Sequence, residues 1–331
     1  MTDTRFDVLT IGNAIVDVIA RVDDAFIARE KLVKGSMNLI DEARAEQLYA
    51  VMGPAQEVSG GSAGNTAAGV ASFGGKAAYF GKVANDQLGK VFSHDIRAID
   101  VAFTTPARES EPPTAQCLIL VTPDGQRTMN TFLGASQFLP ASALDTNMIA
   151  SAEILYLEGY LWDPPEPRAA MQSAIAIARE AGRKVALTLS DAFCIERHRD
   201  SFKALIDSGQ IDILFANEAE MHSLMESDRF DESVNAVAAK VPLLVVTRGP
   251  HGALAVTSGV RTDVSAEPVE KVVDTTGAGD LFAAGFLAGQ AAGRSVADSL
   301  TMGAICAAEV ISHYGPRPEA DLSALVSARL G

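Results

Sequence analysis

Short apolar runs alternate with longer segments of helical spacing along most of this 331-residue chain. The apolar runs are rich in β-branched residues and are bounded by turn residues, which predicts buried strands. They occupy residues 6–12, 77–81, 154–157, 185–189, 211–215 and 243–247. Helices are expected between and after them, at residues 86–100, 167–181, 198–208, 218–226, 231–240 and 295–312. Such alternation predicts right-handed βαβ units, a mostly parallel sheet and an α/β fold.

A different pattern interrupts this alternation in the N-terminal half. Residues 115–122 and 127–132 are extended runs joined by Pro123-Asp124-Gly125-Gln126, which is turn chemistry for a β-hairpin. Together with segments near residues 13–40, the hairpin is expected to form a small sheet apart from the main one. We expect this sheet to be a lid, built from about residues 14–41 and 108–134, on a single domain that spans residues 1–331.

The clearest chemical pattern is the stretch Val273-Asp274-Thr275-Thr276-Gly277-Ala278-Gly279-Asp280, which an alanine-rich helical run follows. The pattern predicts a last strand of the sheet, a turn and a helix start. Without bulky side chains at positions 277–279, backbone amides can converge on an anion at the positive end of the helix. A carboxylate beside that anion is useful if it handles a proton, which suggests that a hydroxyl attacks a phosphoryl group. The alternative that Asp280 only caps its helix stays open.

A second glycine-rich turn, Ser59-Gly60-Gly61-Ser62-Ala63-Gly64-Asn65, opens a helix of small residues. Small residues let a ligand approach the backbone closely, although a tightly packed helix without a ligand would have the same pattern. Residues 60–64 also fit the G-x-S-x-G elbow of a serine hydrolase, with Ser62 as nucleophile and His313 as partner. Against this alternative, residues 54–58 do not have the pattern of a buried central strand.

Polar residues follow two of the predicted strands, where ligands bind in parallel sheets. Asn217 and Glu220 come after one strand, and Thr247 with Gly249 after the next. A carboxylate there can hold Mg²⁺ through water, because Mg²⁺ gives up its water shell reluctantly. The same pair also fits a capping box, and both roles can hold at once.

Composition narrows the classes of function. The formal charge of −15 argues against a nucleic-acid surface. Because the net charge also repels anions, an anionic ligand must be bound locally by amides, a few cations and a metal such as Mg²⁺. Cys117, Cys194 and Cys306 have no paired spacing, which predicts neither a disulfide framework nor a zinc site and fits a reducing cytoplasm. No apolar run reaches membrane-spanning length and the N-terminus lacks a signal pattern, so we expect neither a membrane partner nor export.

The two glycine motifs together resemble the ribokinase-like (PfkB) family of carbohydrate and nucleoside kinases over essentially the whole chain. Gly60-Gly61 with Asn65 is similar to the first signature of the family, and residues 274–280 are similar to the second, which is highly specific. Residues 12–17, 188–193 and 212–220 look most like the adenosine kinase branch. The resemblance implies a three-layer fold with a central, mostly parallel sheet and a small β lid.

The resemblance also implies an activity, the ATP-dependent phosphorylation of the 5′-hydroxyl of a nucleoside, most like adenosine to AMP. Asp280 would be the base, and the amides of Gly277, Ala278 and Gly279 would stabilise the transferring phosphoryl group. The residues implied to bind the nucleoside are Asn13, Ile15, Asp17, Gly61, Asn65, Met129, Thr131, Leu161 and Phe193. Those implied to bind ATP are Arg127, Asn217, Thr247 and Gly249, with Glu220 on Mg²⁺ through water and Asp274 and Thr276 beside a K⁺ ion.

Two positions depart from the adenosine kinase pattern. Leu161 stands where an aromatic residue is common, and Thr276 stands where the branch often has Asn. These two departures concern which nucleobase is bound. A sugar kinase of the same family, acting on ribose, fructose or 2-keto-3-deoxygluconate, is the alternative. The expected partners are a nucleoside or sugar and ATP, bound by a monomer or homodimer in the cytoplasm.

Overall fold

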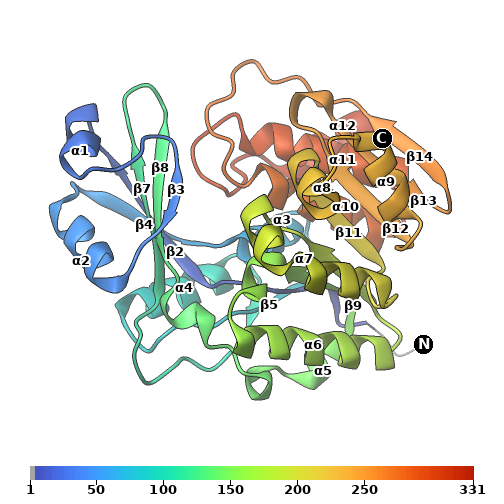
Figure 1. The fold of residues 1–331 in the computed structure, drawn as a ribbon, viewed down its shortest axis with the longest axis horizontal. Coiled ribbons are helices and arrows are strands. Elements are labelled where there is room, and N and C mark those ends of the chain that lie inside the picture. The colour runs from blue at the N-terminus through green and yellow to red at the C-terminus, as the bar shows by residue number, and fades with distance from the viewer. Residues whose placement is uncertain (1–3) are drawn as a thin grey trace.

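The computed structural model describes residues 4–331, which form two β-sheets flanked by helices (Figure 1). The main sheet has nine strands in the order β14-β13-β12-β11-β10-β9-β1-β5-β6. They are β1 (Phe6–Ile11), β5 (Ala77–Phe80), β6 (Ala102–Phe103), β9 (Ala152–Glu158), β10 (Lys184–Thr188), β11 (Ile213–Asn217), β12 (Leu243–Thr247), β13 (Ala253–Thr257) and β14 (Val260–Val264). Neighbouring strands from β12 to β6 in this order pair in parallel, so the predicted α/β class with a mostly parallel sheet is confirmed.

One edge of the main sheet differs from the prediction. The strand expected just before Asp274 is wrong, because Val273 donates its amide to the Ile311 carbonyl (2.8 Å) and lies beside a helix end instead of in a ladder. The sheet is completed by the antiparallel hairpin of β13 and β14. The turn residues Ser258 and Gly259 have φ of 50° and 76°, as a two-residue hairpin turn of the primed type requires.

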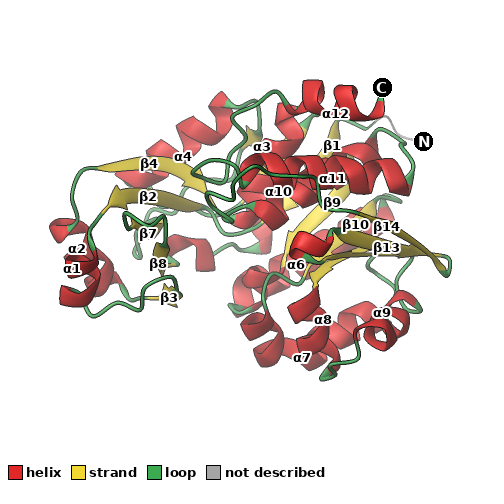
Figure 2. Ribbon diagram, turned by 90° about the horizontal axis from the view of Figure 1, so that it is seen from above, coloured by secondary structure: helices red, strands yellow, loops and turns green. Residues whose placement is uncertain are grey.

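Helices cover both faces of the main sheet and give the molecule three layers (Figure 2). One layer contains α3 (Ser62–Ser72), α4 (Gln87–Ala98), α10 (Ala278–Ala291), α11 (Val296–Val310) and α12 (Leu322–Leu330). The other contains α5 (Thr146–Ala150), α6 (Pro165–Glu180), α7 (Ala192–Asp207), α8 (Glu218–Met225) and α9 (Phe230–Ala238). Side chains along a strand point alternately to the two layers, since Val8 belongs to the first apolar core and Leu9 to the second.

The helices that begin with the two glycine motifs, α3 and α10, pack directly on each other. Their close approach depends on Gly69, because a side chain there would collide with Leu281 and Ala284. The small residues of the α3 sequence therefore set the distance between the two motifs.

The small sheet stands apart from the main one and has five strands in the order β3-β8-β7-β2-β4. They are β2 (Ile15–Arg21), β3 (Met37–Leu39), β4 (Ala55–Gly60), β7 (Ala115–Val121) and β8 (Arg127–Phe132), with α1 (Asp24–Arg29) and α2 (Glu42–Val51) on one face (Figure 1). A separate small sheet was predicted, but β4 lies outside the segments 14–41 and 108–134. Its largely exposed sequence at a sheet edge lacks a clear strand pattern.

Candidate active site

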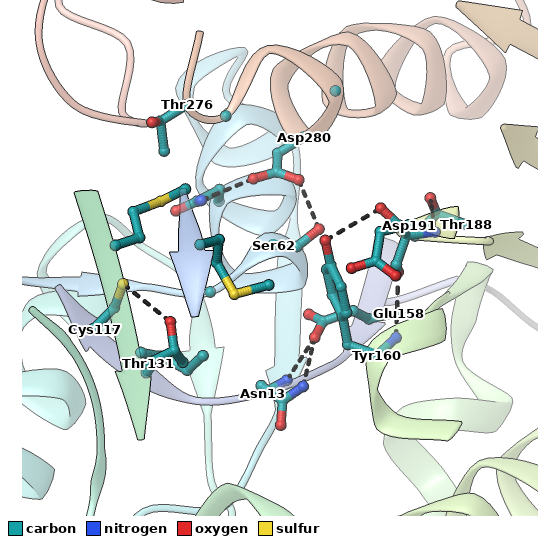
Figure 3. Close-up of a pocket in the computed structure, with 18 of the residues that line it drawn as sticks. Asn13, Ser62, Cys117, Thr131, Glu158, Tyr160, Thr188, Asp191, Thr276 and Asp280 are labelled. Carbon is teal, nitrogen blue, oxygen red and sulfur yellow. Dashed lines mark hydrogen bonds between the residues drawn. The ribbon is translucent and has the colours of Figure 1, made fainter. Parts of the chain in front are cut away.

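A cavity of about 760 Å³ lies between the inner face of the small sheet and the carboxyl ends of the main strands. This is the edge at which ligands bind in open parallel sheets. Figure 3 shows side chains of both sheets and both glycine motifs pointing into it. The predicted residues that line it are Asn13, Ile15, Asp17, Gly61, Asn65, Met129, Thr131, Phe193, Asn217, Glu220, Thr247, Thr276, Gly277, Gly279 and Asp280.

The start of α10 has the geometry of an anion site. Gly277 is the N-cap with φ of 79°, and a side chain there would collide with Pro316, so both its conformation and its surroundings require glycine. Ala278 donates its amide to the Thr275 carbonyl (3.2 Å). The next first-turn amides, those of Gly279 and Asp280, have no acceptor within the helix and lie at its positive end. An anion can bind to these groups.

The Asp280 carboxylate does not cap its own helix, because α3 supplies its partners. Ser62 Oγ donates to Oδ1 (2.6 Å) and Asn65 Nδ2 donates to Oδ2 (2.9 Å), while Thr66 Oγ1 donates to the Asp280 carbonyl (3.2 Å). Residues three and four apart share one face of a helix, so α3 presents all three donors together. Burial raises the pKa of Asp280, and the bonds from Ser62 and Asn65 oppose this rise. The site thus holds a proton acceptor beside an anion site.

The serine hydrolase alternative is wrong on the same geometry. The Ser62 hydroxyl donates to a carboxylate instead of to a histidine. The proposed partner, His313, pairs with Glu309 (Nε2 to Oε1, 3.1 Å) on α11. Without the expected histidine beside it, the Ser62 hydroxyl does not belong to a Ser-His pair of the serine hydrolase type.

Glu158, which was not predicted as a site residue, links the segment after β1 to the start of α3 within the cavity. Its Oε1 accepts from Asn13 Nδ2 (2.8 Å) and its Oε2 accepts from the amide of Ala63 (2.9 Å). Burial raises the pKa of Glu158 to about 7 against these hydrogen bonds. An acidic residue at the carboxyl end of the predicted strand at 154–157 was the available signal.

Asp17 and the two glycines beside it form the wall nearest the small sheet. Asp17 is 6% exposed, and burial raises its pKa to about 7, while Arg317 and Arg127 lower it. A side chain at Gly60 would collide with the Asp17 carboxylate, and one at Gly61 with the Asn13 carbonyl. The first glycine motif is therefore needed for close packing of these polar groups. The first strand ends at Ile11, and residues 12–14, which include Asn13, cross from it to β2 of the small sheet.

Asn217 and Glu220 form the predicted capping box at the start of α8. Asn217 Oδ1 accepts from the Glu220 amide (2.8 Å), and Glu220 Oε2 accepts from the Asn217 amide (3.0 Å). Burial raises the pKa of Glu220 to about 7. Glu220 Oε1 also accepts from Asn217 Nδ2 (2.6 Å), so both of its carboxylate oxygens take part in the cap. Both residues line the cavity, where the second lone pair of each oxygen can accept from a water shell.

Among the predicted ligand residues, Leu161 and Gly249 do not line the cavity. Leu161 is fully buried in the core of the second helix layer, because the short helix η3 (Gly159–Trp162) turns it inward. Its neighbour Tyr160 faces the cavity in its place and donates its hydroxyl to the Ser190 carbonyl (3.2 Å; Figure 3). Gly249 lies in the short helix η4 (Gly249–His251) with φ of 53° and does not line the cavity, whereas Thr247 does.

Arg127 and Asp274 form a buried ion pair that links the small sheet to the second glycine motif. Arg127 Nη2 lies 2.7 Å from Asp274 Oδ2, which also accepts from the amide of Gly315 (3.1 Å). Asp274 Oδ1 accepts from the amide and the hydroxyl of Thr276. Both oxygens are thus engaged, so these side chains do not fit a K⁺ site in this conformation. Arg127 itself is outside the cavity lining.

Arg317 is a second site residue that the sequence did not reveal. It lies in the loop after α11, is partly buried, and donates to the carbonyls of Gly64 and Ser59, both at 2.8 Å. These partners are more than 250 residues away in the sequence, with separations of 253 and 258. A lone arginine after the last long helix gives no local pattern from which such contacts follow.

Other expectations concern metals, membranes and cysteines. Within residues 4–331, no group of three or more His, Cys, Asp or Glu side chains could hold a metal ion, and no helix is long and apolar enough to cross a membrane. Cys117, Cys194 and Cys306 are all buried and free.

Known proteins share both the sequence and this fold. The chain matches the family described as pfkB family carbohydrate kinase over residues 7–321. It is 26% identical to an adenosine kinase of Saccharomyces cerevisiae, covering 93% of this chain and 95% of that protein. A solved adenosine kinase from Sinorhizobium meliloti has a TM-score of 0.91 at 51% identity and covers 98% of this chain and 99% of its own. A probable sugar kinase from Rhizobium etli CFN 42 has a TM-score of 0.93 at 50% identity with the same coverage. The resemblance drawn from the two glycine motifs is confirmed, and the chain is a kinase that belongs to the pfkB carbohydrate kinase family.

Proposed function

We propose that this kinase transfers the γ-phosphoryl group of ATP to the 5′-hydroxyl of a nucleoside, converting adenosine to AMP. The observation that carries the proposal is the Asp280 carboxylate, fixed by Ser62 and Asn65 beside the first-turn amides of α10. In that arrangement the carboxylate can accept a proton from a substrate hydroxyl while the amides bind the phosphoryl group beside it.

In the proposed reaction the 5′-hydroxyl donates a hydrogen bond to Asp280. Its oxygen attacks the γ-phosphorus, its proton passes to the carboxylate, and the bond from the γ-phosphorus to the bridging oxygen breaks to release ADP. Phosphoryl transfer needs charge stabilisation more than covalent help from the protein. The amides at Gly277, Ala278 and Gly279 supply that stabilisation, although the Ala278 amide first has to leave the Thr275 carbonyl.

The nucleoside binds between the first glycine motif and the small sheet. The small sheet is the lid of a single kinase domain that spans residues 1–331. Asn13 and Asp17 bind the ribose hydroxyls, with Gly61 and Asn65 on the same wall. Asn65 Oδ1 is a buried acceptor without a partner among residues 4–331, which supports a role in binding a sugar hydroxyl. The base contacts are Ile15, Met129, Thr131 and Phe193, with Tyr160 in the position proposed for Leu161.

The ATP side uses residues after β11 and β12. Asn217 and Thr247 line the cavity there, Gly249 is assigned to the same side, and Glu220 would hold Mg²⁺ through water. When bound, Mg²⁺ neutralises charge on the phosphates. Arg127 reaches the phosphates only after its ion pair with Asp274 opens, which requires movement of the small sheet. No step is assigned to K⁺, because the oxygens of Asp274 are already engaged.

The choice of a nucleoside over a free sugar rests on the lining of the cavity. Ile15, Met37, Leu39 and Met129 give the small sheet an apolar inner face that suits a flat base. The solved adenosine kinase at 51% identity supports this choice. The probable sugar kinase at 50% identity supports the sugar alternative.

One acceptor panel tests the proposal. We expect adenosine to rank first by kcat/KM, with MgATP as donor, against guanosine, inosine, ribose, fructose and 2-keto-3-deoxygluconate. A free sugar that outranks every nucleoside would overturn the substrate but leave the phosphotransfer chemistry standing. Nucleotide binding without any phosphorylated product would overturn both.

We further propose a place in purine salvage in the cytoplasm, as a monomer or homodimer. The buried free cysteines are compatible with a reducing compartment. Light scattering of the purified protein, with and without adenosine and ATP, decides between the two assembly states.

A further inference from the structure

Arg317 lies where three parts of the site meet. Its Nη1 donates to the Gly64 carbonyl in the first turn of α3, and its Nη2 donates to the carbonyl and hydroxyl of Ser59 at the end of β4 (2.8 and 3.0 Å). The Ser59 amide in turn donates to Asp95 Oδ2 (2.7 Å) on α4. A guanidinium with several fixed acceptors holds them in one geometry, because its donors are coplanar.

The loop that carries Arg317 also touches the anion site. Its Pro316 packs against Gly277, and its Gly315 donates its amide to Asp274. The loop therefore contacts the first glycine motif through Arg317 and the second through the two preceding residues. A shift of this loop would change the position of both motifs.

Two acidic side chains near Asp280, Asp17 and Glu158, oppose its negative charge, while the two tyrosines near it are neutral. Asp17 faces it from β2, Glu158 and Tyr156 from β9, and Tyr160 from η3. The neutral donors Ser62 and Asn65 face it from α3. Among residues 4–331, Arg317 is the cation whose charge favours the ionised form of Asp280, so it lowers the pKa that burial raises.

We propose that Arg317 is a positioning residue for phosphotransfer, which fixes the α3 turn that holds Asp280 and keeps that carboxylate ionised. This inference rests on the proposed role of Asp280 as base. Arg317 touches no reacting atom in it, and acts through the Gly64 carbonyl and through its charge.

The test compares Arg317→Met with Arg317→Lys in kcat between about pH 5 and 9, with MgATP and the best acceptor of the panel. Methionine removes both charge and donors. We expect the acid limb of its pH profile, where kcat falls as Asp280 takes up a proton, to move to higher pH by about one unit. On the acidic side of this limb, kcat should therefore fall about tenfold more than on the alkaline side. Lysine keeps the charge but lacks the planar fork. We expect its limb to stay near that of the wild type while kcat falls evenly across pH.

The matched control is Arg199→Met, which removes another partly buried arginine that donates to a carbonyl (Ser223, 2.9 Å) and pairs with a carboxylate (Glu226, 3.1 Å). It should leave the limb in place. An even loss of kcat across pH in Arg317→Met, or an equal limb shift in Arg199→Met, would show that Arg317 is only structural.

A second measurement does not depend on turnover. Carbon NMR of the labelled Asp280 carboxyl, assigned with Asp280→Asn, gives its pKa directly in the ligand-free protein. We expect this pKa to be higher in Arg317→Met than in the wild type and in Arg317→Lys. Equal values in all three proteins would refute the inference even if no acceptor were found, whereas failure of the acceptor panel alone refutes only the proposed function.

Discussion

The two walls of the cavity are built differently. On the main-sheet side the polar groups are fixed: Asp280 accepts from Ser62 and Asn65, and Glu220 belongs to a capping box. On the small-sheet side, Met37 and Leu39 are 42% and 58% exposed and have only apolar surface to offer. Fixed dipoles are what a transition state needs, whereas apolar contact discriminates weakly between flat ligands. With the proposed function, phosphotransfer would be preorganised on one wall, and the choice of acceptor would be left to the other.

Removing the base should have the largest effect. Asp280→Asn keeps the shape of the side chain but cannot take a proton, so we expect kcat to fall by about 10²–10⁴-fold. ATP binding, measured by calorimetry, should change little because the α10 amides remain. Near-normal turnover would show that the fixed wall does not act through this carboxylate.

Ser62→Ala removes one of the two donors to that base. A hydrogen bond to a charged group contributes about 1.5–3 kcal/mol, so we expect kcat to fall about tenfold or more at acidic pH. The bond lowers the pKa of Asp280, and its loss must raise that pKa and move the acid limb of kcat to higher pH. Thr66→Ser, which keeps a hydroxyl beside the Asp280 carbonyl, is the control and should leave the limb unchanged.

Glu220→Gln separates metal binding from helix capping. Glutamine also serves at this position of a capping box, so Tm should stay close to that of the wild type. The Mg²⁺ concentration for half-maximal velocity should rise several-fold if the carboxylate holds the hydrated ion. Glu220→Ala adds the loss of the cap, which costs about 1 kcal/mol of stability and should lower Tm. An unchanged Mg²⁺ requirement in both variants would show that Glu220 caps the helix and does not bind the hydrated metal ion.

The smallest effect is expected at the exposed rim of the cavity, at the start of α7. Phe193 is 69% exposed, so Phe193→Leu removes only part of an apolar contact. We expect KM for the nucleoside to rise by a factor that corresponds to about 1 kcal/mol, with kcat unchanged. A fall in kcat as large as that of Ser62→Ala would show that this apolar contact takes part in phosphotransfer and not only in acceptor binding.

Local sequence patterns predicted the parts of this molecule that depend on neighbours in the chain. The parallel strands, the small-sheet hairpin and the turn at Gly277 follow from periodicity and backbone chemistry over a few residues. The antiparallel β13–β14 hairpin was not predicted, although Ser258-Gly259 is a turn signal, and the strand expected just before Asp274 is not one. The proposed base contact at Leu161 was off by one residue, since a short helix reverses which side chain faces inward.

Long-range contacts account for the rest. Arg317 meets Gly64, and Ser62 meets Asp280, across 253 and 218 residues. Such pairs are set by how whole layers stack, and no periodicity within either segment contains that information. Asn65 shows the limit well: its place at a helix start was predicted, but its bond to Asp280 was not.

The contact of Gly69 with Leu281 and Ala284 constrains how the acceptor range can evolve. Any side chain at Gly69 would force α3 and α10 apart and separate Ser62 and Asn65 from Asp280. Selection should therefore remove substitutions at this contact, whichever acceptor the enzyme uses. Mutations on the inner face of the small sheet carry no such penalty. Lineages that acquire a new acceptor should therefore differ there first, and laboratory libraries should be directed to the same strands.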